Sequence, residues 1–317
     1  MSHAATIPVE VTAVEQVTPL IRQFTLGPVA GAELPPFSGG SHVIVVLRRR
    51  DRTFRRPYSL MGLPRDRGCY RIAVRRHEDG RGGSLFLHEQ VRAGTRLDIS
   101  YPVNLFPLAR LARKHLLVAG GVGITPMTAM VDDLLGGRVP WELHYVVRGP
   151  EHDHFGRKLL EGGGPVHLYY GSAGLDLGRL LAGQPLGTHV YTCGPAGMIE
   201  AVARAARVAG WVDSHIHHEE FTAPPFGHAF DVRLARSNLT VHVPPERSLL
   251  EAIEAVGVSA PYLCRGGVCG ECETDVLDFD GELIHNDHWL SAEQKAGGRK
   301  IMPCVSRARC THIVLDR

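Results

Sequence analysis

The stretch Cys264-Arg265-Gly266-Gly267-Val268-Cys269-Gly270-Glu271-Cys272 places three cysteines within nine residues. Thiols this close together in one loop are poorly placed to form disulfides with one another, whereas a metal centre requires several thiolates close together. Glycine at positions 266, 267 and 270 lets the backbone approach a bound group closely and adopt torsions closed to other residues. The stretch therefore predicts a metal centre, and it decides the fold of the C-terminal part of the chain.

The spacing of these cysteines distinguishes one kind of metal centre from another. The pattern C-x4-C-x2-C is similar to that of plant-type ferredoxins, in which a distant fourth cysteine completes the ligands of a 2Fe–2S cluster. A structural zinc site is the alternative, but zinc sites favour paired C-x2-C units, and this chain contains one such unit. We therefore expect a 2Fe–2S cluster whose metal ligands are Cys264, Cys269, Cys272 and Cys304.

Strand and helix patterns divide the 317 residues into three blocks. Residues 1–108 contain short β-rich runs separated by Gly and Pro, which predicts an antiparallel β-barrel domain. In residues 109–224, buried apolar strands alternate with helices, which predicts a doubly wound α/β domain with a parallel sheet. Residues 225–317 contain alternating strands and a helix before the cysteine loop, and Phe221–Gly227 is the expected linker.

The same patterns place the individual elements. The expected strands are residues 11–14, 42–47, 70–74, 96–100, 115–119, 141–147, 166–170, 189–193, 230–234 and 239–243. The expected helices are residues 125–135, 195–208 and 248–256. The segment His215-Ile216-His217-His218 is expected to be an exposed strand without the ligand spacing of a metal site.

Composition excludes several classes of function. The net charge is +2, so no bulk electrostatic attraction to nucleic acid or an anionic membrane is expected. No apolar stretch reaches the length of a membrane helix, and the first residues lack the pattern of an export signal. Crowded, unpaired cysteines favour a cytoplasmic location.

Two motifs in the first block predict a flavin site. Arg56-Pro57-Tyr58-Ser59 follows a barrel strand, where an Arg can pair with a phosphate, a Tyr can pack along a flavin, and a Ser hydroxyl can reach its reactive edge. Gly80 to Leu85 opens a helix, and consecutive amides at a helix N-terminus form a phosphate site. The alternative for this second motif is a glycine turn capped by Ser84.

Two loops in the second block follow predicted parallel strands. Gly120 to Met127 lies between a buried strand and a helix, and Cys193 to Met198 follows a later strand. Ligands of α/β sheets bind at the carboxyl ends of the strands, so both loops are expected to meet a nucleotide. Cys193 has an alternative explanation as a small buried apolar residue.

Together, these residues resemble the phthalate dioxygenase reductase family, which includes vanillate demethylase reductases, over nearly the whole chain. The resemblance implies a flavin barrel, a nicotinamide domain and a C-terminal plant-type ferredoxin domain of α+β (β-grasp) fold. It implies FMN rather than FAD, and it implies that Ser59, Cys193 and Glu220 are the catalytic residues, in positioning and electrostatic roles. The alternative is that Glu219 and Glu220 lie on a solvated face between domains. The implied cofactor-binding residues are Arg56, Pro57, Tyr58, Ser59, Ala73, Val74, Arg75, Arg81, Gly82, Gly83, Ser84, Gly121, Thr125, Pro126, Arg148, Cys193, Gly194, Pro195 and Phe221.

The choice of coenzyme depends on the segment from Arg148 to Asp153, which should meet the adenosine ribose. Acidic groups there favour ribose hydroxyls and hence NADH, although Arg148 could contact a 2′-phosphate instead.

These expectations lead to one functional hypothesis and two alternatives. A nicotinamide donates a hydride and a cluster carries one electron at a time, so a flavin between them would convert one into the other. We expect a monomeric NADH-dependent oxidoreductase that reduces a separate oxygenase, of Rieske type, through a surface containing Arg265, Val268 and Glu271. The alternatives are the same module serving a haem-thiolate monooxygenase, and a redox-sensing binding protein on this fold.

Overall fold

A computed structural model describes residues 6–29, 31–49, 53–80, 82–221 and 227–317 of the chain. These residues belong to two compact units, of which the first ends at Phe221. Apart from its two end residues, the expected linker Phe221–Gly227 lies outside the described residues. The first unit contains two sheets, and the second is built around a third sheet.

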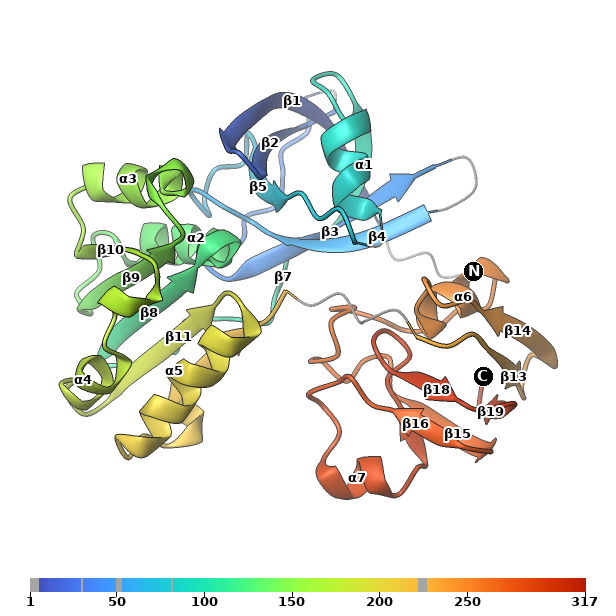
Figure 1. Ribbon diagram of the computed structural model, residues 1–317. Coiled ribbons are helices and arrows are strands. Elements are labelled where there is room, and N and C mark those ends of the chain that lie inside the picture. Colours follow the sequence, from blue (N-terminus) through green and yellow to red (C-terminus); the bar gives the residue numbers. More distant parts are fainter. Residues whose placement is uncertain (1–5, 30, 50–52, 81, 222–226) are drawn as a thin grey trace. The chain divides into compact units, whose positions relative to one another are not determined.

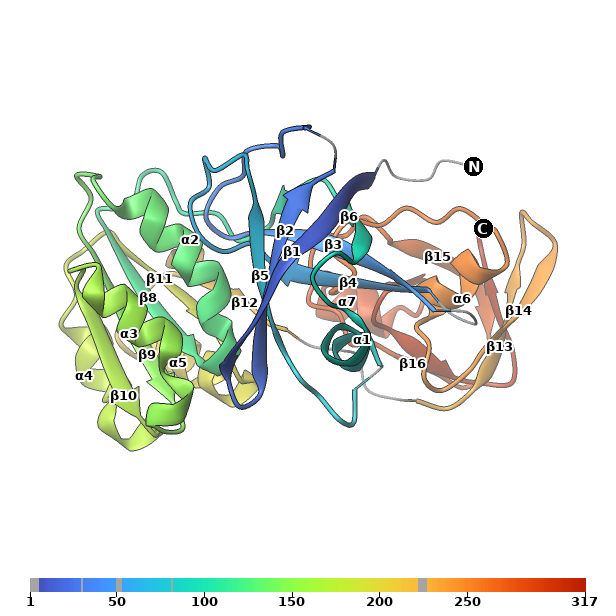
Figure 2. The ribbon, with the colours of Figure 1, turned by 90° about the horizontal axis from the view of Figure 1, so that it is seen from above.

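The first sheet is antiparallel, with the strand order β4-β3-β6-β1-β2-β5 and with β7 paired to β3. Its strands are β1 (Thr6–Thr18), β2 (Ile21–Pro28), β3 (Ser41–Arg48), β4 (Thr53–Ser59), β5 (Tyr70–Arg75), β6 (Arg96–Ser100) and β7 (Val103–Asn104). A bridge between Met61 and Arg71 joins the segment after β4 to β5, so the two ends of this strand order meet and form a barrel. Helix α1 (Gly83–Gln90) lies beside these strands (Figure 2).

The second sheet is parallel and has the strand order β10-β9-β8-β11-β12. Its strands are β8 (Lys114–Gly120), β9 (Trp141–Val147), β10 (Val166–Tyr170), β11 (Thr188–Cys193) and β12 (Ile216–Glu219). Helices α2 (Ile124–Leu134) and α3 (His154–Glu161) cover one face, and α4 (Leu177–Ala182) and α5 (Ala196–Val208) cover the other (Figure 1). Short 3-10 turns are η1 (Gly121–Gly123), η2 (Pro150–His152), η3 (Ser172–Gly174) and η4 (Asp213–His215).

The order of the parallel strands fixes where a ligand can bind. From β8 the chain proceeds outward through β9 and β10, and it then returns to the other side of β8 with β11 and β12. Such a reversal opens a crevice at the carboxyl ends of the two strands that flank it, which here are β8 and β11. The glycine-bearing loops singled out in the sequence follow these two strands.

The C-terminal unit has a five-stranded sheet with the order β14-β13-β19-β15-β17 and a separate pair, β16-β18. Its elements are β13 (Phe230–Leu234), β14 (Leu239–Val243), α6 (Leu249–Ala255), β15 (Thr274–Phe279), β16 (Glu282–Ile284), α7 (Ala292–Ala296), β17 (Lys300–Ile301), β18 (Arg307–Arg309) and β19 (Ile313–Leu315). A capping box between Ser248 and Glu251 fixes the start of α6. Leu249 and Ile253 of this helix pack into the core with Val232 of β13.

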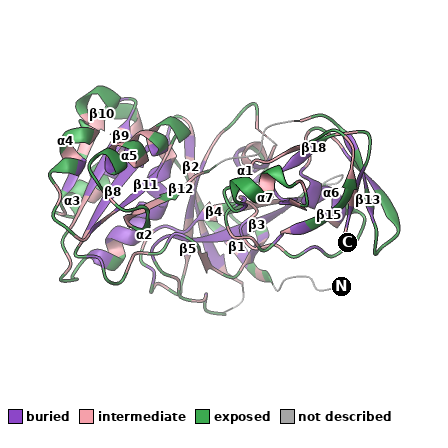
Figure 3. Cartoon of the chain, turned by 90° about the horizontal axis from the view of Figure 1, so that it is seen from below, coloured by how far each residue is buried: buried purple, intermediate pink, exposed green. Residues whose placement is uncertain are grey.

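Burial follows this plan within each unit. The strands are largely buried, whereas the outward sides of the helices and the loops are exposed (Figure 3). On β3, alternate residues such as Val43, Val45 and Leu47 join the core of the barrel. The residues between them therefore point to the opposite face of that strand.

Candidate functional site

Two glycine-bearing loops touch each other at the carboxyl ends of β8 and β11. A Cβ atom at Gly123 would lie 2.2 Å from the carbonyl oxygen of Cys193, so no larger residue fits between the loops. The Tyr145 hydroxyl donates to the carbonyl oxygen of Gly121 at 3.0 Å, which fixes the first loop from β9. The N-termini of α2 and α5 follow these loops directly, and helix N-termini favour the phosphates of a nucleotide.

The residues at the start of the two helices are held by the protein itself. Gly194 has a φ of 159°, and Pro195 then begins α5 as its N-cap. Thr125, in the first turn of α2, is buried, and its hydroxyl donates to the carbonyl oxygen of Val122 at 3.0 Å. Pro126 is buried beside it. These contacts fix the start of both helices at the carboxyl ends of β8 and β11.

A hydroxyl, a thiol and a carboxyl group come together at the same edge. Glu219 ends β12 and is the register partner of Cys193, which ends β11. The Ser59 hydroxyl, at the end of β4, donates to a carboxylate oxygen of Glu219 at 3.5 Å. Sequence reasoning selected Glu220 for this place, whereas the side chain that contacts Ser59 belongs to Glu219. The barrel and the parallel sheet thus contribute to one site.

Burial raises the pKa values of two groups in this site, the Glu219 carboxyl and the Cys193 thiol. It raises the pKa of Glu219 to about 8, and the hydrogen bond from Ser59 opposes that change. Burial, with the charges of Glu219 and Glu220 nearby, raises the pKa of the Cys193 thiol well above its ordinary value. Cys193 is therefore a neutral thiol, suited to packing against a ligand rather than to nucleophilic attack. Glu219 can hold a proton at neutral pH.

The start of α1 forms a second candidate site, for a phosphate. A Cβ atom at Gly83 would lie 3.0 Å from Cγ of Arg56, so the Arg56 side chain runs past the helix N-terminus. Gly82 is the N-cap residue, with a φ of 83°, and the first turn contains no acidic residue. The Ser84 hydroxyl accepts from the amide of His77 at 3.2 Å, which leaves its own proton for a ligand. Free amides, a guanidinium and a hydroxyl are suitable partners for a phosphate dianion.

A pair of arginines lies where the two sheets of the first unit approach each other. Arg75 ends β5, after the buried Ala73 and Val74, and Arg148 directly follows β9. Burial and the charge of Arg148 lower the pKa of Arg75, so the two guanidinium groups are close enough to repel each other. Two converging cations are suited to a bound anion such as a pyrophosphate.

The remaining predicted cofactor residues lie in different surroundings. Tyr58 packs against the barrel core, and burial raises the pKa of its phenol. Pro57 is exposed, and Phe221 is exposed at the end of the first unit. Arg81 lies outside the described residues.

The four predicted metal ligands of the C-terminal unit come together in two pairs. Cys269 donates to the sulfur of Cys264, and this bond, with backbone amides that include Gly266 at 3.3 Å, lowers the pKa of Cys264 to about 5 against the effect of burial. A hydrogen bond from Cys304 likewise lowers the pKa of Cys272. All four thiols are free of disulfides. This set fits a 2Fe–2S cluster, in which each iron takes two thiolates and backbone amides stabilise the negative charge.

The backbone of the cysteine loop differs in one respect from the expectation. Gly267 and Gly270 have φ values of 77° and 79°, as expected for glycines that wrap a bound group. The third such residue is Arg265, with a φ of 55°, rather than Gly266. The expectation of a torsion closed to other residues is therefore confirmed at Gly267 and Gly270 and wrong at Gly266.

Arg265 also differs from its predicted role on the docking surface. Its guanidinium lies 3.6 Å from the centroid of the Tyr262 ring and pairs with the Glu254 carboxylate. Its side chain is only 5% exposed, so the prediction that Arg265 is an exposed docking residue is wrong. The pattern of the cysteine loop does not predict this contact, because Tyr262 and Glu254 come from outside that loop.

Exposed residues beside the cluster loop include an aromatic side chain that sequence reasoning missed. Val268 is 45% exposed and Glu271 is exposed, as expected. Trp289 is 50% exposed, and a Cβ atom at Gly270 would lie 2.3 Å from its ring. Its indole nitrogen donates to Glu273 at 3.1 Å. An indole packed on the cluster loop and open to solvent is a candidate for contact with a partner.

Comparison with known proteins identifies the family. Residues 232–309 match the model of the 2Fe-2S iron-sulfur cluster binding domain. The chain is 44% identical to the carnitine monooxygenase reductase subunit of Acinetobacter baumannii, with 99% of each chain covered. The chain belongs to the phthalate dioxygenase reductase family. The solved structure of phthalate dioxygenase reductase superimposes with a TM-score of 0.87 at 33% identity, covering 99% of this chain and 98% of that one. The reductase is also 44% identical to the beta subunit of the heme-dependent oxidative N-demethylase of Ectopseudomonas mendocina, over 97% of this chain and 98% of that subunit.

Membership of this family confirms the expected fold class and the expected kind of enzyme. The reductase is a flavin and iron–sulfur oxidoreductase that transfers electrons from a nicotinamide dinucleotide to a separate oxygenase component. The flavin and the 2Fe–2S cluster are its resident cofactors. In the described part of the chain, no helix of the reductase has both the length and the apolar character needed to cross a membrane.

The histidines of residues 215–218 are partly enclosed. His217 Nε2 lies 2.9 Å from His189 Nδ1, and the His217 ring stacks on Tyr191 with 4.6 Å between centroids. His215 stacks on His189 at 4.1 Å. The expectation of an exposed strand is therefore correct for His218 and wrong for His215 and His217, which are half-buried.

A second group of histidines lies on the other face of the same sheet. Glu142, His144 and His167 bring potential metal-ligating atoms within 4.8 Å of one another. However, Glu142 accepts from the Gln184 amide at 2.9 Å and pairs with Lys114 at 3.2 Å, while the two imidazoles stack on each other. The carboxylate already has its counter-cation, so these contacts account for the group.

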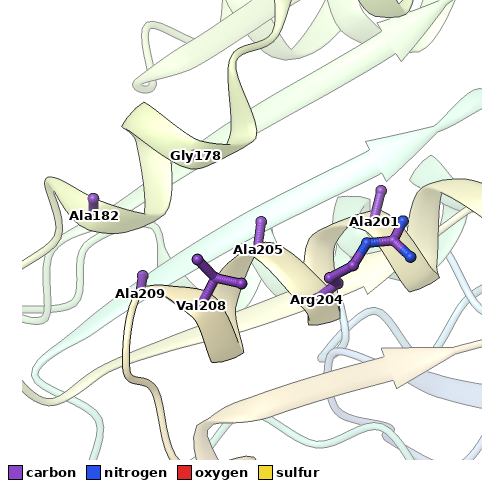
Figure 4. Close-up of a pocket in the computed structure, with 7 residues that line it drawn as sticks. All are labelled: Gly178, Ala182, Ala201, Arg204, Ala205, Val208 and Ala209. Carbon is purple, nitrogen blue, oxygen red and sulfur yellow. The ribbon is translucent and has the colours of Figure 1, made fainter.

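Helices α4 and α5 form a shallow groove on the outside of the parallel sheet, with a volume of 350 Å³ (Figure 4). Its lining is small and apolar except for one arginine, and it consists of Gly178, Ala182, Ala201, Arg204, Ala205, Val208 and Ala209. None of these residues belongs to the loops that form the candidate site.

Proposed function

We propose that the reductase passes electrons from NADH through FMN and one 2Fe–2S cluster to a Rieske-type oxygenase. The convergence of Ser59, Cys193 and Glu219 is the observation that supports this most directly. These residues come from β4, the barrel strand with the flavin motif, and from β11 and β12 of the parallel sheet, of which β11 flanks the nucleotide crevice. A site built from both sheets can hold a flavin and a nicotinamide against each other.

FMN is favoured over FAD by the start of α1. Arg56, Gly82, Gly83 and Ser84 form a site with the donors that a terminal phosphate requires. We assign the FMN phosphate to this site, and the flavin ring to the vicinity of Tyr58 and Ser59. In this proposal residues 1–108 bind the flavin, residues 109–224 bind the nicotinamide and residues 225–317 bind the cluster.

NADH is favoured over NADPH by the loops that follow β9 and β10. The loop after β10, residues 171–176, contains no basic residue that could pair with a 2′-phosphate. Asp153 is the N-cap residue of α3, and its buried carboxylate accepts from the Tyr170 hydroxyl at 2.6 Å and pairs with Arg157, so the exposed Glu151 is the carboxylate of this segment that remains at the surface. Carboxylates in this region favour ribose hydroxyls over a phosphate. Arg148 is then assigned to the pyrophosphate together with Arg75.

The residues of the chain act by placing and shielding the reactants. When bound, the flavin accepts a hydride and releases electrons one at a time. Ser59 provides a hydroxyl at the flavin edge, and the neutral Cys193 packs beside the nicotinamide without competing as a nucleophile. Glu219 is the carboxyl group that contacts Ser59, and in its protonated form it adds no buried negative charge to the site.

The nature of the partner is supported by the names of the relatives. Among the relatives described above, one is a monooxygenase reductase subunit and another a subunit of a heme-dependent demethylase. The second name favours a haem protein as the alternative partner. We retain a Rieske oxygenase, a monomeric reductase and a cytoplasmic location as the proposal. A redox-sensing protein is the remaining alternative.

Three measurements test this proposal. Acid release and chromatography should yield FMN, and iron analysis should give about two irons per chain. NADH should support steady reduction of ferricyanide with a higher kcat/KM than NADPH. FAD in the extract would contradict the phosphate assignment, zinc would contradict the cluster, and absence of turnover by the fully loaded protein would contradict the reductase function.

The partner requires its own assay. The loaded reductase is mixed with purified Rieske and haem-containing oxygenases under NADH, and reduction of each is followed by its absorbance. Faster reduction of a haem protein than of every Rieske protein tested would replace the proposed partner with the alternative.

A further inference from the structure

The four predicted cluster ligands come from two separate segments of the C-terminal unit. Three of them lie in the cysteine loop, whereas Cys304 lies between β17 and β18. One hydrogen bond joins the two segments, because the Gly267 amide donates to the sulfur of Cys304. Hydrogen bonds to the sulfurs help to set the reduction potential of an iron–sulfur cluster. Whatever fixes Gly267 relative to Cys304 therefore acts on the cluster.

A turn between β16 and α7 packs against the cysteine loop at Gly267. A Cβ atom at Gly267 would lie 3.1 Å from Cα and 3.3 Å from Cβ of Asp287, and 2.6 Å from Cγ2 of Val305. The carbonyl oxygen of Gly267 accepts from the amide of His288 at 3.0 Å. The turn therefore holds the residue whose amide donates to Cys304.

The side chain of Asp287 reaches the other segment. Its carboxylate accepts from the Ser306 hydroxyl at 3.1 Å, and Ser306 is two residues beyond Cys304. The same carboxylate accepts from the Leu290 amide at 2.9 Å, and Nζ of Lys295 lies 3.7 Å from it. Asp287 thus contacts the cysteine loop through its backbone and the Cys304 segment through its side chain.

Asn286, the preceding residue, makes a parallel connection. Its side-chain amide donates to the carbonyl oxygen of Val305 at 3.1 Å, and its backbone amide donates to the Ser306 oxygen at 3.3 Å. A hydroxyl both accepts and donates, so Ser306 can bond to Asn286 and Asp287 at the same time. Residues 286–288 are therefore bonded to both segments that supply cluster ligands.

The Asp287 carboxylate is fully buried, with 0% of its side chain exposed. Burial opposes its ionisation, but the hydrogen bonds to it and the charge of Lys295 outweigh burial and hold the pKa of Asp287 below its ordinary value. The group is therefore an anion at neutral pH. A hydrogen bond to an ionised acceptor is roughly twice as strong as one between neutral groups, so the bond from Ser306 is a firm link.

We propose that Asp287 is a positioning residue for the 2Fe–2S cluster, holding Cys304 against the cysteine loop through its bond with Ser306 and its packing on Gly267. Loss of this link weakens the hydrogen bond from Gly267 to Cys304. The cluster is then released more readily. It is also harder to reduce, because the one electron that it receives adds a negative charge that this bond stabilises. The inference rests on the ligand set of the proposed function.

Release of iron from the full-length, cluster-loaded protein tests the link. In the presence of an iron chelator, Asp287→Ala should lose its visible absorbance about tenfold faster than wild type. Ser306→Ala should also lose it faster, and the double variant should be no faster than Asp287→Ala, because the two residues share one bond. Asp287→Asn should recover part of the retention, because its amide oxygen still accepts from Ser306.

The reduction potential is a readout that a general loss of stability does not move. Ser306→Ala breaks the link and keeps the charge of Asp287, so the midpoint potential of its cluster should be more negative than that of wild type. Redox titration monitored through the electron paramagnetic resonance signal of the reduced cluster measures this shift.

Asp280→Asn is the matched control. Asp280 belongs to the same unit and also accepts several hydrogen bonds, but its partners are Thr311 and His312 rather than residues of the cluster site. This variant should keep its iron within about twofold of the wild-type rate, and its potential should be that of wild type.

Several outcomes would overturn the proposal. These are equal rates of iron loss in Ser306→Ala and wild type, an unchanged potential in Ser306→Ala, multiplying losses in the double variant, no recovery in Asp287→Asn, or an equal effect of Asp280→Asn. If the wild-type protein contains zinc or no metal in place of iron, the proposed ligand set fails instead, so the two failures are distinguishable.

Discussion

Replacing Glu219 with Gln removes a carboxyl group whose proton affinity differs between the folded and unfolded chain. Burial raises the pKa of Glu219 from 4.5 to about 8. Between these values the folded protein keeps a proton that the unfolded chain has lost. Stability contributed by this group is therefore fully present below a pH of about 4.5 and is lost as the pH rises through about 8.

The size of the effect follows from the same two values. Between about pH 5 and pH 9, linkage removes roughly 4 kcal/mol from the free energy of unfolding of the first unit. The Glu219 side chain keeps some contact with solvent, so a loss on the order of 3 kcal/mol is expected. The Glu219→Gln variant has no such titration, and its stability relative to wild type should rise steadily with pH.

Urea unfolding of the flavin-loaded protein is carried out at several pH values and monitored through release of the flavin. The unfolding free energies obtained in this way measure the difference between the variant and wild type. Glu220→Gln is the matched control, because it removes the same formal charge from the next residue. Parallel pH profiles for wild type and Glu219→Gln would refute the reasoning, as would an equal change in the Glu220→Gln profile.

The remaining predictions concern the cluster loop, its surface and the histidines. Gly270→Ala should abolish cluster incorporation, measured by visible absorbance, because a Cβ atom at this position would overlap Trp289. Gly257→Ala is the control, because Gly257 also has a positive φ, of 80°, but has open space around it, and this variant should keep the cluster. Equal loss of the cluster in both variants would implicate backbone strain alone. Trp289→Ala should slow electron transfer to the oxygenase by about tenfold with the cluster intact, and an unchanged rate would place the docking surface elsewhere. Burial lowers the pKa of His217 to about 4, below its unfolded value of 6.5, so stability present above about pH 6.5 is lost as the pH falls toward 4. In the Glu219→Gln background, which lacks the opposing titration, His217 should account for about 1–2 kcal/mol of the fall in unfolding free energy between pH 7 and pH 5, and His217→Asn should make the fall smaller by that amount.

Local pattern was sufficient for several of the strands and for selecting the four cysteines that the structure brings together. The expected strands 141–147, 166–170, 230–234 and 239–243 coincide with β9, β10, β13 and β14. An apolar run or a strict alternation reports burial directly, because the faces of a strand repeat every two residues. The cysteine spacing was informative for a similar reason, since most of its ligands come from one short loop.

Contacts between distant segments were beyond the sequence. Glu219 and Glu220 are neighbours of the same type, and the choice between them depends on which one faces Ser59 from another sheet. Asp287 and Ser306 are separated in the sequence, and their contact beside the cysteine loop depends on how the chain folds between them. The sequence predicts an exposed cation at Arg265, whereas in the structure its guanidinium contacts Tyr262 and Glu254.

The place of β19 in the C-terminal sheet has a consequence for how the reductase is made. This strand lies between β13 and β15, yet it is synthesised after every other strand of the unit. All four predicted ligand cysteines therefore leave the ribosome before the middle of their sheet exists, and β13 and β15 each lack one of their two neighbours until it arrives. Units of this kind complete folding only when their last central element arrives. Closure of the sheet by β19 therefore follows the synthesis of all four thiols.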